Sequence, residues 1–388
     1  MKRILQDERG IALAIAIFAL VVVGALVAGA FFAGTQEQRV ADNQRRVQAS
    51  FGVAEAGVTE QLVNWTTVNN TRGVYWASAA PRDSILVRDT IAPGGTGRYA
   101  GTVYRVGNSL FLVDVVGRDT RSAGGTVGGG GGARQRIGLI TRLAPVEFDI
   151  RASLTTQGGV NVQGNAQVSG FDQNPDGWAS CGIPGIPMAG VRDKGGTVTT
   201  GGNGTVTGLP AVMNDPSLSD SNFTNFHGTS YAQLAAKANI TLPGGNYSTA
   251  PVVNGAGVCD RAVLTNWGDG DNPLAPCGSY FPIIHMTGSV TLNGVQGQGI
   301  LLVDGDLNVQ GSYQFYGIVI IQGDLKTAGG GSTEAHFWGG VMAKNADLSV
   351  QNITGKATMN YSSCSILSAL QLSSSPAMMR SRGWVQLY

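Results

Sequence analysis

Residues 8–33 read ERGIALAIAIFALVVVGALVAGAFFA, in which a short charged segment leads directly into an uncharged, mainly apolar run. No charged side chain lies between Arg9 and Glu37. At about 1.5 Å of rise per residue, a helix from Ile11 to Ala33 is about 34 Å long, enough to cross the hydrocarbon core of a bilayer. The sequence therefore predicts one membrane-spanning helix near the N-terminus, followed by a region of soluble composition.

Three kinds of N-terminal segment compete for this pattern. A cleaved secretory signal needs an apolar core of about 7–15 residues before a small-residue cleavage site. Residues 28–30 (Ala-Gly-Ala) offer such a site, but the apolar core before them is too long for that class. The second interpretation is an uncleaved signal anchor. The third is a prepilin-type leader, residues 1–10, cleaved between Gly10 and Ile11.

Apolar residues continue beyond the membrane run at helical spacing. They are Val40, Val47, Phe51, Ala54, Val58 and Leu62. This spacing keeps them on one face of a helix with 3.6 residues per turn, and no proline occurs before Pro81 to break it. We therefore expect one continuous helix over residues 11–63, about 80 Å long, with half of it beyond the bilayer.

Four short motifs accompany this helix. They are ERG at 8–10, QR at 38–39, ADNQ at 41–44 and FGVAEAG at 51–57. With these motifs, residues 8–62 resemble the N-terminal module of type IV pilus assembly proteins of the PilX class, which are relatives of type II secretion minor pseudopilins. The resemblance implies cleavage by a prepilin peptidase after Gly10, N-methylation of Ile11, and contacts of the helix with other pilins or minor pilins.

One position departs from the pattern of most pilins. The fifth residue of the mature chain is commonly Glu in that family, whereas here it is Ile15. The same departure is found in tip-type minor pseudopilins and in the PilX class. The resemblance therefore implies a priming or capping subunit rather than a major one.

The remaining sequence is neutral and rich in turns. The chain has 58 glycines, 13% charged residues and a net charge of +1, so no basic patch points to nucleic acid. Residues 64–147 are expected to form a small antiparallel β domain, with strands over 98–106, 110–117 and 134–143. The glycine tract 124–132 is interpreted as a hairpin loop, because no Lys-Ser/Thr and helix pattern follows it, as a phosphate-binding loop requires.

Residues 148–388 contain an imperfect repeat. The segment Gly299–Leu307 is echoed by Gly317–Leu325 and more loosely by Gly340–Leu348, with terminal leucines 18 and 23 residues apart. Such a period suits the coils of a parallel β-solenoid. The expected fold is thus α+β: a long pilin-like helix, a small antiparallel sheet, and a Gly-rich β region that is a parallel β-helix or, as the alternative, a β-sandwich.

The four cysteines all follow the membrane segment, at Cys181, Cys259, Cys277 and Cys364. None forms a C-x-x-C pair, so zinc or thioredoxin-like chemistry has little support. In an exported head they can form disulfides, and four cysteines allow three connectivities. We prefer Cys259 with Cys277, which clips a polar loop and leaves Cys181 for Cys364; free thiols are the alternative.

The C-terminal region carries a second resemblance. Residues 277–284 (CGSYFPII), the Gly299–Leu307 coil and residues 361–364 (YSSC) resemble the solenoid region appended to some PilX-like proteins. This resemblance implies an architecture rather than an activity.

Residues suited to catalysis or metal binding are few. The three histidines are His227, His285 and His336, and His285 lies in an apolar run typical of a core residue. Four aspartates of the repeat, Asp304, Asp306, Asp324 and Asp347, either line a calcium or sugar groove or serve as turn residues. Residues 268–272 (GDGDN) look calcium-like but lack the EF-hand spacing, which favours a plain loop. We therefore expect no catalytic residues, no metal and no cofactor.

Two functions from different classes follow from these observations. The first is a minor pilin-like structural subunit for type IV pilus assembly, with a β-rich head displayed for adhesion or interaction. It would span the inner membrane once, with its head in the periplasm, and later reach the pilus or cell surface. The second is a membrane-anchored carbohydrate-binding or carbohydrate-active β-helix protein. A mature N-terminus at Ile11, Met1 or Phe31 separates the prepilin, anchor and secretory interpretations.

Overall fold

The computed structural model describes residues 8–75, 84–95, 97–119, 133–178, 181, 185–328, 334–344, 350–354, 356–379 and 383–387. The chain divides into two compact units, one of residues 1–64, 74–141 and 378–388 and the other of residues 65–73 and 142–377. Most of the expected leader, the glycine tract 124–132 and Asp347 lie outside the described residues.

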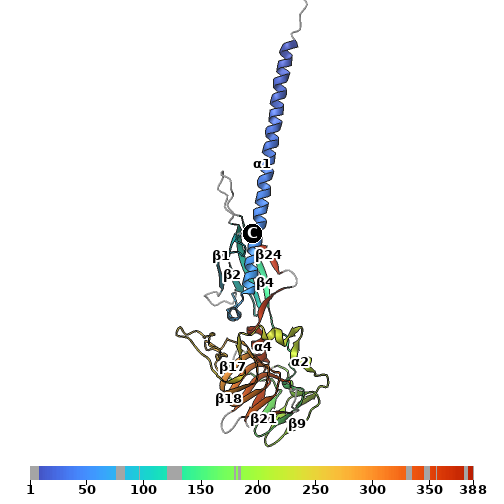
Figure 1. Cartoon of the computed structure of the whole chain (residues 1–388), viewed down its shortest axis with the longest axis vertical. Coiled ribbons are helices and arrows are strands. Elements are labelled where there is room, and N and C mark those ends of the chain that lie inside the picture. The colour runs from blue at the N-terminus through green and yellow to red at the C-terminus, as the bar shows by residue number, and fades with distance from the viewer. Residues whose placement is uncertain are drawn as a thin grey trace, which may run out of the picture. The chain divides into compact units, whose positions relative to one another are not determined.

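The first unit is built on helix α1 (Glu8–Val63). The N-terminal part of α1 extends well beyond the sheet of this unit, while its C-terminal part lies against that sheet (Figure 1). Ala54 and Val58 are fully buried there. The helix ends at Val63, in agreement with the end expected at about this residue, and begins at Glu8, before the expected start at Ile11.

The sheet of the first unit is antiparallel where β1 (Ile85–Ile91), β2 (Gly97–Arg105) and β3 (Leu110–Asp119) pair in turn. β4 (Arg134–Ala144) lies next to β3, and the C-terminal strand β24 (Trp384–Leu387) pairs antiparallel with β4. β2, β3 and β4 correspond to the three expected strands. β1 and β24 were not expected, and the return of β24 places the last residues in this unit rather than in the C-terminal region.

In its described residues, the second unit holds most of the strands and four short helices. Its large sheet contains β5 (Ala152–Thr156), β6 (Gly159–Val162), β7 (Gln167–Ser169), β8 (Ala189–Asp193), β9 (Val198–Thr200), β10 (Thr205–Thr207), β11 (Val212–Asn214), β14 (Ile240–Leu242), β15 (Gly245–Thr249), β16 (Ile283–Met286), β17 (Val290–Val303), β18 (Leu307–Ile321), β19 (Leu325–Ala328), β20 (Ala335–Ala343), β21 (Val350–Thr354) and β22 (Thr358–Asn360). The other elements are η1 (Thr67–Thr71), α2 (Asp220–Thr224), β12 (Asn225–Phe226), β13 (Thr229–Ser230), α3 (Tyr231–Ala235) and α4 (Ser363–Leu372). The strand after α4, β23 (Ser375–Met378), belongs to the six-stranded sheet, where it lies next to β4.

Strands of the large sheet pair in parallel and form three ladders. The first ladder runs β14, β16, β17, β18, β20, β5, β8, β11. The second runs β15, β17, β18, β19, β21, β6, β9. The third runs β17, β18, β20, β22, β7, β10. Long strands such as β18 therefore contribute to all three (Figure 1).

The three ladders share one hydrophobic core. Leu301 of the first ladder, Val309 of the second and Phe315 of the third belong to the same buried cluster. A second cluster lies on the other side of the first ladder, where Ile300 and Ile318 meet Ile366 of α4. Alternating side chains of one strand thus enter two different cores, as the period of two along a β-strand requires.

The register of the repeat is set by glycines. Gly299 pairs with Gly317 and Leu307 with Leu325, as the first two copies of the sequence repeat predict. The third copy was placed one residue too far along, because Gly317 pairs with Gly339 and not with Gly340. Gly317 and Gly339 have φ of +136° and +141°, and a Cβ at Gly339 would overlap the carbonyl oxygen of Gly317.

The ladders do not follow the order of the chain. β5, which comes first in the sequence, pairs with β20, and β6 and β7 pair with β21 and β22. The N-terminal strands of the unit therefore continue the ladders beyond its C-terminal strands. Connecting segments with α2 and α3 lead from β11, at one end of the first ladder, to β14 at the other end.

Candidate functional site

The apolar run of α1 is exposed along its length. Ile15, Phe18 and Phe31 have exposed fractions of 63%, 70% and 74%. Within the described parts of the chain, α1 is the one helix long and apolar enough to cross a membrane. Large exposed apolar surfaces mark contact with a membrane or with other proteins, so this run is the first candidate functional surface. Gly10 and Ile11, the expected cleavage site, lie within α1.

The covered face of α1 differs from the predicted one. Val40, Val47 and Phe51 are 56%, 40% and 40% exposed, although the spacing placed them on the face of Ala54 and Val58. The reason is that the sheet covers the helix only from about Ser50 onward, where Val53 is buried instead of Phe51. An exposed apolar stripe therefore continues along α1 beyond the expected membrane span.

The aspartates of the repeat serve mainly as turn residues. Asp306 Oδ1 accepts a hydrogen bond from the Asp324 backbone N–H at 2.9 Å, and the Asp306 N–H donates to Ser289 Oγ at 3.0 Å. Asp304 Oδ1 instead accepts a bond from the Tyr231 hydroxyl at 2.9 Å and lies 2.9 Å from His285 Nε2. Asp306 thus bonds to the backbone of Asp324, whereas Asp304 lies against the side chains of Tyr231 and His285, so these two aspartates make separate contacts.

The three histidines lie in three different environments. The His285 side chain is 15% exposed and faces Asp304, so it is not the plain core residue that its apolar neighbours suggested. His227 is exposed, with Nδ1 lying 3.2 Å from the carbonyl oxygen of Glu147. His336 stacks on Trp338 with ring centroids 4.3 Å apart, and burial lowers the pKa of its imidazole.

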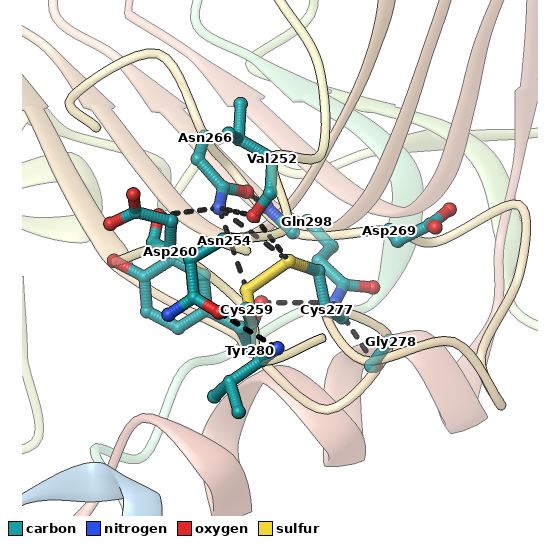
Figure 2. Close-up of a disulfide and its surroundings, with 12 residues drawn as sticks. Val252, Asn254, Cys259, Asp260, Asn266, Asp269, Cys277, Gly278, Tyr280 and Gln298 are labelled. Carbon is teal, nitrogen blue, oxygen red and sulfur yellow. Dashed lines mark hydrogen bonds between the residues drawn. A yellow bond between two sulfur atoms is a disulfide. The ribbon is translucent and has the colours of Figure 1, made fainter. Parts of the chain in front are cut away.

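Both disulfides have the connectivity preferred from the sequence. Cys259 is bonded to Cys277 and Cys181 to Cys364, with Cα atoms 4.8 and 5.8 Å apart. Figure 2 shows the Cys259–Cys277 bond beside Asn266, whose amide donates to the carbonyl oxygens of Val252 and Asp260 at 3.0 and 2.7 Å.

Gln298 joins the loop of this disulfide to strand β17. Its Nε2 lies 3.1 Å from the carbonyl oxygen of Cys277 and 2.9 Å from that of Tyr280 (Figure 2). Gln298 and Cys277 are fully buried. The loop is thereby held against the third ladder by both a covalent bond and buried hydrogen bonds.

The calcium-like segment 268–272 belongs to the same loop, and one carboxylate oxygen of each of its aspartates is bonded to protein groups. Asp269 Oδ1 accepts from Gln296 Nε2 at 2.9 Å and from the Asn272 N–H at 3.1 Å. Asp271 Oδ1 accepts from the Tyr316 hydroxyl at 2.7 Å. Among the described residues, no three His, Cys, Asp or Glu side chains are arranged to hold a metal ion.

A row of polar side chains crosses the third ladder. The polar row consists of Gln296, Gln314, His336 and Thr358, which are paired in register on β17, β18, β20 and β22. Beside it lies a hollow of about 390 Å³, lined by Asp271, Val295, Ser312, Gln314, Glu334 and His336. Sequence reasoning missed this row. The signal was present, because Gln296, Gln314 and His336 each stand three residues before a glycine of the register, at 299, 317 and 339.

Comparison with known proteins gives only faint structural likeness. No family model and no curated protein matches the chain. The crystal structure of competence-associated pilin ComZ from Thermus thermophilus is similar over 88% of this chain and 98% of that chain, with 12% identity and a TM-score of 0.22. A TM-score this low does not establish a shared fold, so function is argued below from the residues.

Proposed function

We propose that this chain is a pilin-like structural subunit of the minor type, which serves type IV pilus assembly through α1 and displays its β-rich units at the fibre. The observation that supports it is the long apolar surface of α1, exposed in the same chain as compact β units. Such a surface can lie in lipid and afterwards pack against the helices of other subunits, since both surroundings are apolar.

The stripe beyond the membrane run supports this use of the helix. Val40, Val47 and Phe51 are exposed on a part of α1 that carries charged residues such as Arg39 and Asp42. An anchor alone has no need of apolar residues there, whereas a helix packed among other helices does. In this proposal Ile15, which cannot pair a carboxylate with a neighbour's amino terminus, favours a priming or capping place in the fibre.

The proposal has several finer parts. A prepilin peptidase cleaves after Gly10 and the new N-terminus at Ile11 is methylated, as the PilX-like resemblance implies. The subunit spans the inner membrane with its head in the periplasm, a compartment in which disulfides persist. The second unit is a β-helix rather than a β-sandwich, which is supported by parallel pairing at a step of 18 residues between Gly299 and Gly317. No catalytic activity is assigned.

The mature N-terminus tests the proposal directly. The full chain, co-expressed in bacterial membranes with a prepilin peptidase, should give an intact mass that begins at methylated Ile11. Gly10→Lys should block this processing, whereas Ala30→Leu, which removes the small residue of the secretory-type site, should leave it unchanged. A mature chain that begins at Met1 or Phe31 would overturn the proposal.

A further inference from the structure

We propose that the hollow beside the polar row binds a neutral, hydroxyl-rich glycan chain. This inference goes beyond the role of α1 and does not depend on it, because all residues of the hollow lie in the second unit. It assigns to the second unit a class of ligand and the site at which that ligand binds.

The first argument is the geometry of the row. Gln296 pairs with Gln314, Gln314 with His336, and His336 with Thr358. Gln296 is buried and both ends of its amide are bonded to Asp269 and Asp271, so the members of the row that line the hollow are Gln314 and His336. They stand side by side on parallel strands about 4.8 Å apart. A linear polymer of sugar units presents hydroxyls along its length and can bond to several such groups at once.

The second argument is the unused hydrogen-bonding capacity that faces the hollow. Gln314 Oε1 lies 2.8 Å from the Tyr316 hydroxyl, and within the described parts of the chain no partner is assigned to the Gln314 amide nitrogen. Asp271 accepts one bond through Oδ1, and among the described residues no partner is assigned to its Oδ2. Carboxylate and amide groups together both accept from and donate to hydroxyls, which single-function groups cannot do.

The third argument is charge. The residues that line the hollow include the carboxylates Asp271 and Glu334 and neither lysine nor arginine. Glu334 accepts from the Thr358 hydroxyl and lies 3.8 Å from His336 Nδ1. Burial disfavours the charged form of His336, so the hollow is negative and repels anionic polymers such as nucleic acids and acidic polysaccharides.

The fourth argument is rigidity. Two aromatic pairs adjoin the row on the same face of β18 and β20: His336 stacks on Trp338, and Tyr316 stacks on Trp178 with centroids 5.5 Å apart. On one side the wall is the loop closed by the Cys259–Cys277 disulfide, which carries Asp271. The Asp271 N–H donates a hydrogen bond to Gln296 Oε1 at 2.8 Å, which holds Asp271 in place. A site held in this way loses little conformational entropy when a ligand binds.

The test uses the full chain in detergent micelles, with soluble neutral oligosaccharides (cello-, laminari- and manno-oligosaccharides) as probes and calorimetry as the readout. We expect binding of at least one neutral class, weakened about tenfold by Gln314→Ala and by Glu334→Gln. Asn308→Ala is the matched control, because Asn308 lies on the same strand β18 but pairs in the second ladder. It should bind as the unaltered chain does.

Three results would overturn the inference. They are the absence of binding to every neutral probe, equal binding by the Gln314→Ala and Asn308→Ala variants, and tighter binding of alginate or of an acidic peptide than of any neutral glycan. Circular dichroism checks that each variant keeps the fold. Processing at Gly10 is measured separately, so failure here leaves the proposed role of α1 standing.

Discussion

Gly117 of β3 lies directly against Ala54 of α1, so closely that a Cβ atom at Gly117 would overlap the Ala54 backbone nitrogen. The helix and the sheet of the first unit therefore meet backbone to backbone. At Gly57, one turn further along the helix, an added Cβ would stand 2.6 Å from the ring of Tyr99.

We expect Gly117→Ala to destabilise the first unit by about 1–3 kcal/mol, because neither backbone can move aside without disturbing the sheet. The measurement is urea unfolding of the detergent-solubilised chain. Gly52→Ala is the control on the same helix, where nothing lies within 4 Å, and it should stabilise α1 by up to about 1 kcal/mol. Equal effects of the two substitutions would contradict this packing.

A second prediction concerns the pairing of Gly317 with Gly339. Gly339→Ala should destabilise the second unit by several kcal/mol, because φ is +141° there and the new Cβ meets the carbonyl oxygen of Gly317. Gly340→Ala should cost less, since its nearest obstacle at 2.6 Å is the Cγ2 methyl of the Ile150 side chain rather than backbone, and no positive φ is required there. Thermal unfolding of both variants decides between the observed register and the one expected from the sequence.

The ion pair between Arg192 and Asp215 makes the stability of the second unit depend on pH in the acidic range. The Arg192 guanidinium is 3% exposed and bonds Asp215 at 2.6 Å. Hydrogen bonds from Ser217 and Arg192 lower the pKa of Asp215 to about 2. Because the folded pKa lies below the ordinary value, the contribution of Asp215 is complete above about pH 4 and is lost as the pH falls toward 2. In acid titrations, Asp215→Asn should therefore be less stable than the unaltered chain at pH 6, and the difference should vanish near pH 2.

The two disulfides should differ in what their removal costs. Cys181–Cys364 joins residues 183 positions apart, and Cys259–Cys277 joins residues 18 apart. Loop-closure entropy then makes the first bond worth about 2 kcal/mol more than the second. Chemical unfolding of the Cys181→Ala/Cys364→Ala and Cys259→Ala/Cys277→Ala double variants measures the difference. A larger loss from the second pair would contradict the entropic argument and point to the hydrogen bonds of its loop.

Sequence patterns predicted those features of the fold that depend on residues close together in the chain. The uncharged run and the absence of proline predicted a helix from Ile11 to about Val63, and α1 spans Glu8–Val63; the leucine spacing predicted the pairing of Leu307 with Leu325. The exposed side of Phe51 could not be predicted, because it depends on where a sheet from elsewhere in the chain begins to cover the helix. Trp384 pairs with Leu139, a partner too distant in sequence for any periodicity to reveal.

The candidate glycan site was missed for a related reason. Gln314 and His336 become neighbours only in the register that pairs Gly317 with Gly339. A shift of one residue along β20 moves the opposite set of side chains to the outside, so the site could not be assembled from the repeat as first aligned. The sequence contains two adjacent glycines, Gly339 and Gly340, either of which could pair with Gly317. Only the close approach of Gly339 to the carbonyl oxygen of Gly317 in the structure identifies Gly339 as the partner.

The pairing of β5 with β20 has a consequence for the order in which the head is made. Residues 152–214 leave the ribosome long before residues 335–360, which supply the partners of β5, β6 and β7. Until then their edges have nothing to pair with and present open hydrogen-bonding groups to any other nascent chain. Completion of the second unit is thus a late event of high contact order, governed by the arrival of the C-terminal strands.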